Sequence, residues 1–141
     1  MDVRERIDVA AATADVWAVM IDVERWREWT PTITSIERFD GGPFRIGSRA
    51  RVRQPKLPTA IWTVIALVPG RYFEWHNMSP GLRSVAGHRV EPTPDGGSTV
   101  TLTFSWSGWL AWLIRLVYGA LAHRYVRTES ESLKRWCERA G

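Results

Sequence analysis

The fold is decided by residues 109–140, which read WLAWLIRLVYGALAHRYVRTESESLKRWCERA. Side chains three and four positions apart lie on the same face of an α-helix. The apolar residues of this stretch recur at those spacings: Leu110, Leu113, Ile114, Val117, Leu121, Tyr125 and Trp136. The stretch therefore predicts one long C-terminal helix with a buried side, and the rest of the chain must supply the surface that this side covers.

A sheet is the expected partner of this helix. Between residues 33 and 106, short alternating apolar and polar runs are separated by Gly and Pro, a pattern typical of antiparallel strands joined by turns. The predicted strands are residues 3–9, 33–39, 47–54, 59–68, 72–77, 82–91 and 98–106. Their apolar faces need a cover, and only the C-terminal helix is long enough to provide it. A curved sheet that grips a helix leaves a hollow between them.

Two short helices are expected after the first strand. Thr13 can cap the first of them, with Asp15 in its first turn, where the helix dipole favours an acid. A second short helix is predicted over residues 22–29, and Pro31 ends it. The order of one strand, two short helices, six strands and a long helix predicts an α+β fold, and the length fits a single domain over residues 1–141.

Composition narrows the class of ligand. The chain has 141 residues, of which nine are Trp, and this many large rings must fill either a core or a cavity wall. The formal net charge is +4, with 17 Arg and 2 Lys, but these residues are scattered among acids. Because no basic run forms a stripe, we expect no nucleic-acid partner.

The chain lacks the usual signals for a metal, a nucleotide cofactor or export. Cys137 is the only cysteine, so an intrachain disulfide and a thiolate metal site are excluded. The histidines His76, His88 and His123 do not have the short spacings of zinc ligands, and no Gly-rich phosphate loop is present. The N-terminal residues 1–6 carry charges where a secretory signal would need an apolar block, so export is not expected and a cytoplasmic protein is favoured. We therefore expect no metal and no cofactor.

Strand alternation predicts which side chains face the helix. Successive residues of a strand point to opposite faces of the sheet. On residues 72–77 and 98–106, the apolar sets are taken as inward: Phe73, Trp75 and Asn77, and Val100, Leu102, Phe104 and Trp106. On residues 84–91 the charged pair Arg89 and Glu91 belongs in water, which turns His88 inward. His88 is the ionisable side chain expected in the hollow, either as a general acid or base or as a plain hydrogen-bonded core histidine.

Several short motifs in a fixed order support a family resemblance. They are DVERWREWTP at 22–31, GSR at 47–49, WTV at 62–64, PGRYFEW at 69–75 and HRVEP at 88–92. Together with the order of elements, they resemble the START-like SRPBCC superfamily, and within it the polyketide cyclase/dehydrase-type bacterial proteins. The resemblance implies a helix-grip fold, in which a seven-stranded curved antiparallel sheet wraps around a long C-terminal helix and two short helices plug one end. Its members bind apolar or aromatic small molecules and lipids, and some are aromatase/cyclases.

The expected function is therefore the binding of an apolar or aromatic small molecule, lipid or polyketide-like, in a Trp-lined cavity. The predicted cavity residues are Trp26, Trp29, Trp62, Phe73, Trp75, Asn77, His88, Leu102, Phe104, Trp106, Leu113 and Val117. The alternatives are a cyclase/dehydrase-type enzyme that uses His88 as acid or base, and a protein-interaction module that uses the apolar half of the C-terminal helix. No catalytic dyad is evident, which favours a non-enzymatic protein.

Residues 106–122 carry a single charged residue, Arg115, and resemble a membrane span. The uninterrupted apolar run is too short to cross a bilayer, so no stable membrane insertion is expected. The surplus apolar surface on Trp109, Trp112 and Leu116 instead predicts a homodimer contact, a lid over the pocket or a transient contact with a membrane.

Overall fold

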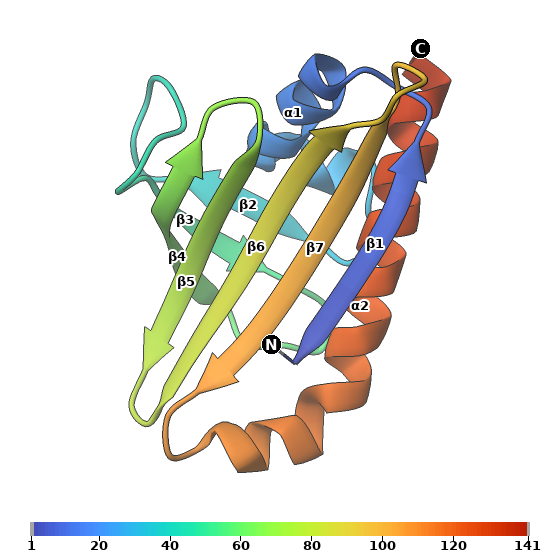
Figure 1. Ribbon diagram of the computed structural model, residues 1–141. Coiled ribbons are helices and arrows are strands. Elements are labelled where there is room, and N and C mark those ends of the chain that lie inside the picture. Colours follow the sequence, from blue (N-terminus) through green and yellow to red (C-terminus); the bar gives the residue numbers. More distant parts are fainter. Residues whose placement is uncertain (1, 141) are drawn as a thin grey trace.

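A curved sheet and a long helix dominate the computed structural model, which describes residues 2–140 (Figure 1). Within these residues the helices are α1 (Thr13–Ile21), the 3₁₀ helix η1 (Val23–Glu28) and α2 (Ala111–Ala140). The strands are β1 (Val3–Val9), β2 (Ser35–Arg38), β3 (Arg49–Arg53), β4 (Ala60–Val68), β5 (Tyr72–Ser79), β6 (Leu82–Pro92) and β7 (Ser98–Ser107). The predicted α+β class and helix-grip fold are confirmed, and most boundaries differ from the predicted ones by one or two residues.

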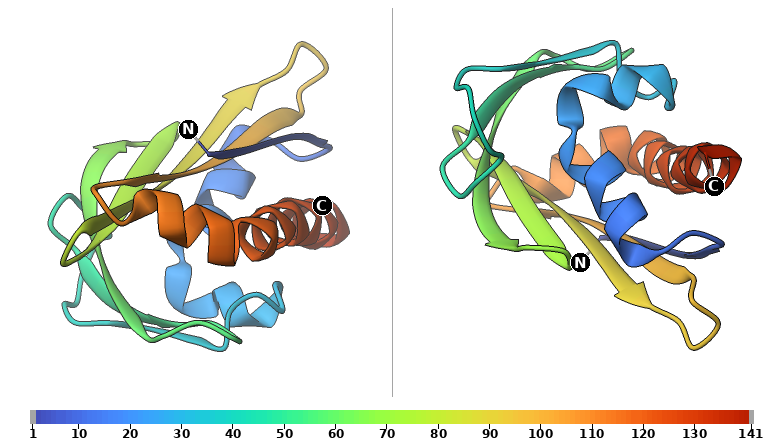
Figure 2. Two further views of the ribbon diagram at one scale, coloured as in Figure 1. Left: turned by 90° about the horizontal axis from the view of Figure 1, so that it is seen from below. Right: turned by 90° about the horizontal axis from the view of Figure 1, so that it is seen from above.

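The strands of residues 2–140 form one seven-stranded antiparallel sheet in the order β1-β7-β6-β5-β4-β3-β2. Consecutive strands from β2 to β7 pair with one another, and β1 pairs with β7, so β1 and β2 form the two edges of the sheet. A bulge between Val64 and Ala66 shifts the register of β4 against β5. Bulges increase local twist and bending. Figure 2 shows that the sheet bends around α2 in both views.

The short helices close one end of the concave side (Figures 1 and 2). The residue that precedes α1 is Ala12, and no side chain caps the helix, so the prediction of Thr13 as the cap is wrong: Thr13 is already the first helical residue. Asp15 lies in the first turn as expected. The Trp26 indole Nε1 of η1 donates to the Met20 carbonyl oxygen at 3.1 Å, which ties η1 to the end of α1.

The largest buried cluster lies beneath α1 and η1. Phe73 on β5 is fully buried, and its ring is surrounded by five other rings. Val16 and Met20 from α1 and Val23 from η1 are also buried in this cluster. The short helices therefore fill the space between the sheet and α2 at this end.

Helix α2 begins at Ala111, two residues later than predicted. Its first turns run across the bottom of the molecule in Figure 1, and the remainder climbs along β1 and β7. The start is attached to the β5–β6 turn, because the Leu110 amide donates to the Gly81 carbonyl oxygen at 2.9 Å. Farther along, Lys134 Nζ donates to the Asp8 carbonyl oxygen of β1 at 2.8 Å. No helix among residues 2–140 has both the length and the apolar composition needed to cross a membrane.

Candidate functional site

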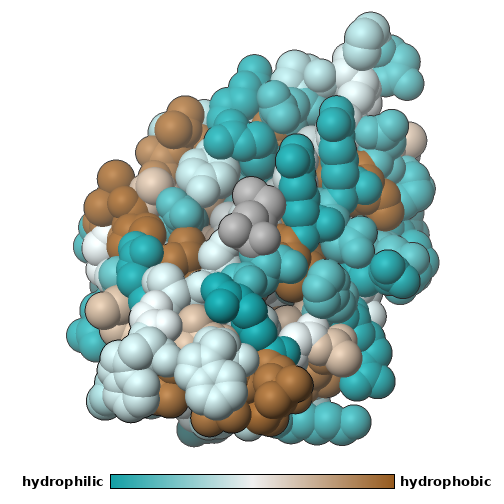
Figure 3. Space-filling model, turned by 60° about the horizontal axis from the view of Figure 1, so that its bottom comes forward, coloured by the Kyte–Doolittle hydropathy of each residue, from teal (hydrophilic) through white to brown (hydrophobic). Residues whose placement is uncertain are grey.

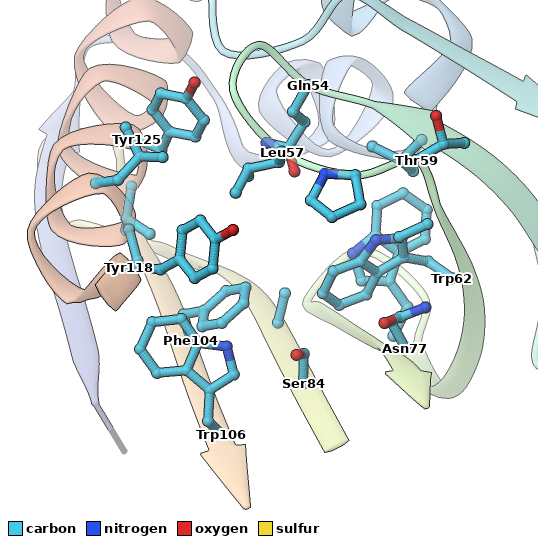
Figure 4. A pocket seen from close by; sticks show the side chains of 18 of the residues that line it. Gln54, Leu57, Thr59, Trp62, Asn77, Ser84, Phe104, Trp106, Tyr118 and Tyr125 are labelled. Carbon is cyan, nitrogen blue, oxygen red and sulfur yellow. The ribbon is translucent and has the colours of Figure 1, made fainter. Parts of the chain in front are cut away.

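A cavity of about 580 Å³ lies between the sheet and α2. Figure 4 shows the side chains around its open centre, with Tyr118, Phe104 and Trp106 on one side and Trp62 across from them. The wall is mainly apolar and aromatic, and it draws residues from η1, β3 to β7, the β3–β4 loop and α2. An enclosure of this kind suits a small molecule with flat apolar surfaces.

The sheet side of the cavity is built from inward positions of adjacent strands. Trp75 on β5 and Trp62 on β4 lie with ring centroids 5.9 Å apart, and Phe104 on β7 contacts both Trp62 and Trp106 edge-on. The rings thus support one another from four positions. A ring held in this way presents a fixed surface to a ligand and loses little freedom when the ligand binds.

The helix side of the cavity follows one face of α2. Its residues recur at spacings of three and four: Ile114, Tyr118, Leu121, Ala122, Tyr125, Val126 and Glu129. The Tyr125 hydroxyl donates to the Pro55 carbonyl oxygen of the β3–β4 loop, which fixes this ring at the wall. Tyr118 carries its hydroxyl toward the centre of the cavity (Figure 4).

Leu113 and Val117 lie outside the cavity, so their predicted placement is wrong. Leu113 is 37% exposed and Val117 is 62% exposed, on the side of α2 that faces solvent. The first half of α2 is apolar on nearly its whole circumference. Apolar residues at spacings of three and four therefore occur on more than one face of the helix, and the spacing alone does not show which face is buried. The face that carries Ile114 and Tyr118 is the one turned toward the cavity.

Seven of the twelve predicted cavity residues line the observed one: Trp26, Trp62, Trp75, Asn77, His88, Phe104 and Trp106. Phe73 and Leu102 point inward as predicted but are buried in the packed core instead. Trp29 packs against that core from η1's end, with its ring centroid 5.7 Å from that of Trp26. Phe73 is covered by Trp17 of α1 and Trp26 of η1, which separate it from the cavity.

His88 is buried at the wall, between the packed core and the cavity. Its ring stacks on Phe73 with centroids 4.1 Å apart and planes 9° apart, and Trp26 lies 5.3 Å away. Burial lowers the pKa of His88 to about 3. The imidazole is therefore neutral at physiological pH, and Nδ1 is buried without a hydrogen-bond partner within residues 2–140. A neutral imidazole can orient a ligand but holds no proton to give as an imidazolium.

Glu129 is the ionisable wall residue that sequence reasoning missed. It lies in the polar run TESES, which reads as a solvated surface, yet it lines the cavity one helical turn after Tyr125. Burial raises the pKa of Glu129 to about 7, and no charged neighbour contributes to this shift. Its position four residues after Tyr125 and eight after Leu121 was the available signal.

Two of the uncharged polar wall residues already form hydrogen bonds with backbone carbonyl oxygens. Asn77 Nδ2 donates to the Ile61 carbonyl oxygen at 2.8 Å, and Gln54 Nε2 donates to the Thr32 carbonyl oxygen at 3.3 Å. Ser84 on β6 also lines the cavity (Figure 4). These groups are held in place by the backbone and add a few polar points to an apolar wall.

Cys137 is buried on α2, away from this cavity. Burial, followed by the nearby charges of Asp15 and Glu138, raises the pKa of the thiol to about 11. The thiol therefore stays protonated at physiological pH and is a poor nucleophile. Across residues 2–140, no three side chains of His, Cys, Asp or Glu come together in a way that could hold a metal ion.

The solvent-facing side of the first turns of α2 is apolar. Trp109, Trp112 and Leu116 are 74%, 65% and 76% exposed. Figure 3 brings this end of the molecule forward and shows hydrophobic side chains gathered at its lower edge. The exposure agrees with surplus apolar surface, but a dimer, lid or membrane contact through these residues stays a prediction.

A family model described as "Polyketide cyclase / dehydrase and lipid transport" matches residues 1–138. The chain belongs to this family. The match spans the sheet, the cavity and nearly all of α2, so the resemblance seen in the short motifs is confirmed. A search of curated proteins finds no match to the sequence.

Solved structures share the fold at low sequence identity. A hypothetical protein from Helicobacter pylori has a TM-score of 0.80 at 13% identity, over 96% of this chain and 86% of that one. A START superfamily protein from Mycobacterium smegmatis has a TM-score of 0.70 at 14% identity, over 98% and 97%. A di-domain ARO/CYC from the steffimycin biosynthetic pathway has a TM-score of 0.71 at 13% identity, over 97% of this chain and 44% of that one. At such identities the likeness shows the fold alone.

Proposed function

We propose that this protein binds an apolar or aromatic small molecule, lipid or polyketide-like, in the cavity between the sheet and α2. The observation that carries the proposal is the cavity itself, which has a volume of about 580 Å³ and a wall made mostly of aromatic and aliphatic side chains. Small-molecule pockets commonly measure roughly 300–1,000 Å³ and carry only a few polar groups. The cavity fits both descriptions.

Apolar burial would supply most of the affinity. Each Å² of apolar surface removed from water contributes about 25 cal/mol, and the rings of Trp62, Phe104 and Trp106 are already held in place by mutual contacts. Pre-arranged rings reduce the entropy lost on binding. The family description, which names both cyclase/dehydrase chemistry and lipid transport, agrees with a ligand of this kind.

The proposal is tested by filling the cavity without changing the outer surface. Ala122 on α2 lines the cavity, whereas Ala120, two residues earlier, is exposed. Ala122→Phe is expected to weaken binding tenfold or more, and Ala120→Phe is expected to leave it unchanged. Binding is measured by intrinsic Trp fluorescence during titration with fatty acids, flavonoids and aromatic polyketides. A panel that leaves the emission of the wild-type protein unchanged, or that binds Ala122→Phe as well as wild type, contradicts the proposal.

An enzyme of the cyclase/dehydrase type is the second candidate function. The observation in its favour is Glu129, because a carboxyl with a pKa of about 7 can both give and take a proton near neutral pH. His88, with a pKa of about 3, is a weaker candidate for this role. Mass spectrometry of a bound polyketone decides between the functions: conversion that is lost in Glu129→Gln while binding is retained favours the enzyme.

A further inference from the structure

Glu129 occupies the inner end of the helix wall. It is the last residue of α2 that lines the cavity, which begins on this helix at Ile114. One turn farther on, Leu133 is 1% exposed and belongs to the packed core. A ligand that fills the cavity along α2 therefore reaches the Glu129 carboxyl with its far end.

No Lys or Arg side chain among residues 2–140 shares the cavity wall with Glu129. Among residues 2–140 the wall contains neither Lys nor Arg, and Glu129 takes part in none of the ion pairs formed by these residues. An ionised carboxylate in an apolar enclosure without a counter-charge is costly. A ligand that brings a positive charge removes this cost, whereas an anionic head group adds to it.

The aromatic wall suits the same charge. The negative face of an aromatic ring attracts a cation that lies within about 6 Å of its centre, and Trp is the most effective ring. Trp62, Trp75, Trp106 and Tyr118 all line the cavity. An ammonium group inside the cavity would meet ring faces along the wall, while its apolar body would contact the remaining wall.

We infer that the cavity selects molecules that join an apolar or aromatic body to a protonated amine, with the ammonium group held by the Glu129 carboxylate. The inference rests on the proposed binding function and narrows its ligand class. It separates amines from fatty acids, whose carboxylate would find no basic partner in the wall. It also separates amines from neutral alcohols of the same shape, which bring no positive charge to the ionised carboxyl.

The inference sets the sign of the pH dependence. Burial holds the pKa of Glu129 at about 7, so ionisation of this group rises between pH 5.5 and pH 8. The other titratable wall residues are His88 from β6 and Tyr118 and Tyr125 from α2; η1, β3, β4, β5, β7 and the β3–β4 loop contribute none. His88, with a pKa of about 3, remains neutral over this range. Amine affinity should therefore increase with pH, while the affinity of a neutral ligand that accepts a hydrogen bond from the protonated carboxyl should fall.

Three probes of one shape test the inference by calorimetry: 4-phenylbutylamine, 4-phenylbutanol and 4-phenylbutyrate. At pH 8 the amine should bind at least tenfold more tightly than either of the others, and its affinity should be lower at pH 5.5. Glu129→Gln should remove the preference for the amine, which is the ratio of the amine and alcohol affinities measured in the same variant. Glu131→Gln, which makes the same charge change at an exposed position of α2, should behave as wild type. Glu129→Asp, which retains the charge, should keep part of the preference.

The outcomes separate the two proposals. Equal binding of the amine and the alcohol, or an amine preference that survives Glu129→Gln, overturns the inference and leaves the binding function standing. Tightest binding by 4-phenylbutyrate also overturns it. Absence of binding by all three probes and by the wider panel of apolar ligands overturns the proposed function, and the inference falls with it.

Discussion

The space between the sheet and α2 has two ends that use the same residue types in different ways. Beneath α1 and η1, the Phe73 ring has neighbouring rings within 6.4 Å on several sides and no exposed surface. Toward the start of α2, Phe104 contacts Trp62 and Trp106 and then faces open volume. Aromatic residues therefore build a core where the short helices fill the interior, and a cavity wall where α2 crosses the sheet beyond them.

The largest contrast is expected from truncating one ring at each end. Phe73→Ala should destabilise the protein by about 3–5 kcal/mol, because the lost contacts leave a void in a packed region. Phe104→Ala should cost less than half as much, because one side of that ring already lacks neighbours. Urea unfolding followed by circular dichroism measures both. Equal losses would show that the two ends are packed alike.

Acid should lower the stability of the folded protein through His88, which lies beside the packed end. The pKa of His88 is about 3 in the folded protein, below the ordinary 6.5, so only the unfolded chain takes up this proton in mild acid. Stability should therefore fall as the pH drops below about 6.5, by about 3 kcal/mol between pH 7 and pH 4. His88→Gln should remove this part of the slope, whatever its effect at neutral pH, and His123→Gln at an exposed position should keep it. An unchanged slope in His88→Gln would place the acid sensitivity elsewhere.

Glu129, which lines the cavity, should have the opposite pH dependence, because it lowers the stability of the folded protein as the pH rises. The pKa of Glu129 is raised from 4.5 to about 7 in the folded protein, so the folded chain holds a proton that the unfolded chain releases. Stability should fall as the pH rises through this window, by about 2–3 kcal/mol between pH 5 and pH 8. Glu129→Gln should be more stable than wild type at pH 8, and Glu131→Gln should not. Thermal unfolding across this range gives the slopes; a Glu129→Gln curve parallel to wild type would contradict the burial of the carboxyl.

The comparison also explains what sequence patterns could predict. Alternation along β5 and β6 correctly turned Phe73, Trp75 and His88 toward the helix, because the direction of a strand side chain is a local property. Whether an inward residue becomes core or cavity wall depends on the element that crosses above it. Phe73 lies under α1 and η1 and became core, while Trp75, two residues later, reaches the cavity.

Periodicity along α2 was informative only where polar residues mark one face. Around Leu133 and Cys137 the apolar residues stand among charges, so one buried side is defined. Around Leu113 and Val117 nearly every position is apolar, and the pattern does not choose between faces. Glu129 was missed as a cavity residue for a third reason. Its ionisable side chain predicts exposure to solvent, and only its place in the helical repeat indicates that it lines the cavity.

The attachment at the start of α2 limits how this protein can open. The Trp109 indole lies so close to Gly81 that a Cβ there would approach it to 2.7 Å, and a Cβ at Gly108 would approach the Gly81 carbonyl oxygen to 2.4 Å. The β5–β6 turn is therefore packed tightly against the residues that lead into α2, and the hydrogen bond from the Leu110 amide to the Gly81 carbonyl oxygen joins the two segments. The β3–β4 loop, which belongs to no helix or strand, places Leu57, Pro58 and Thr59 on the cavity wall. A movement confined to that loop would leave the contacts of Gly81 with Gly108 and Trp109 intact.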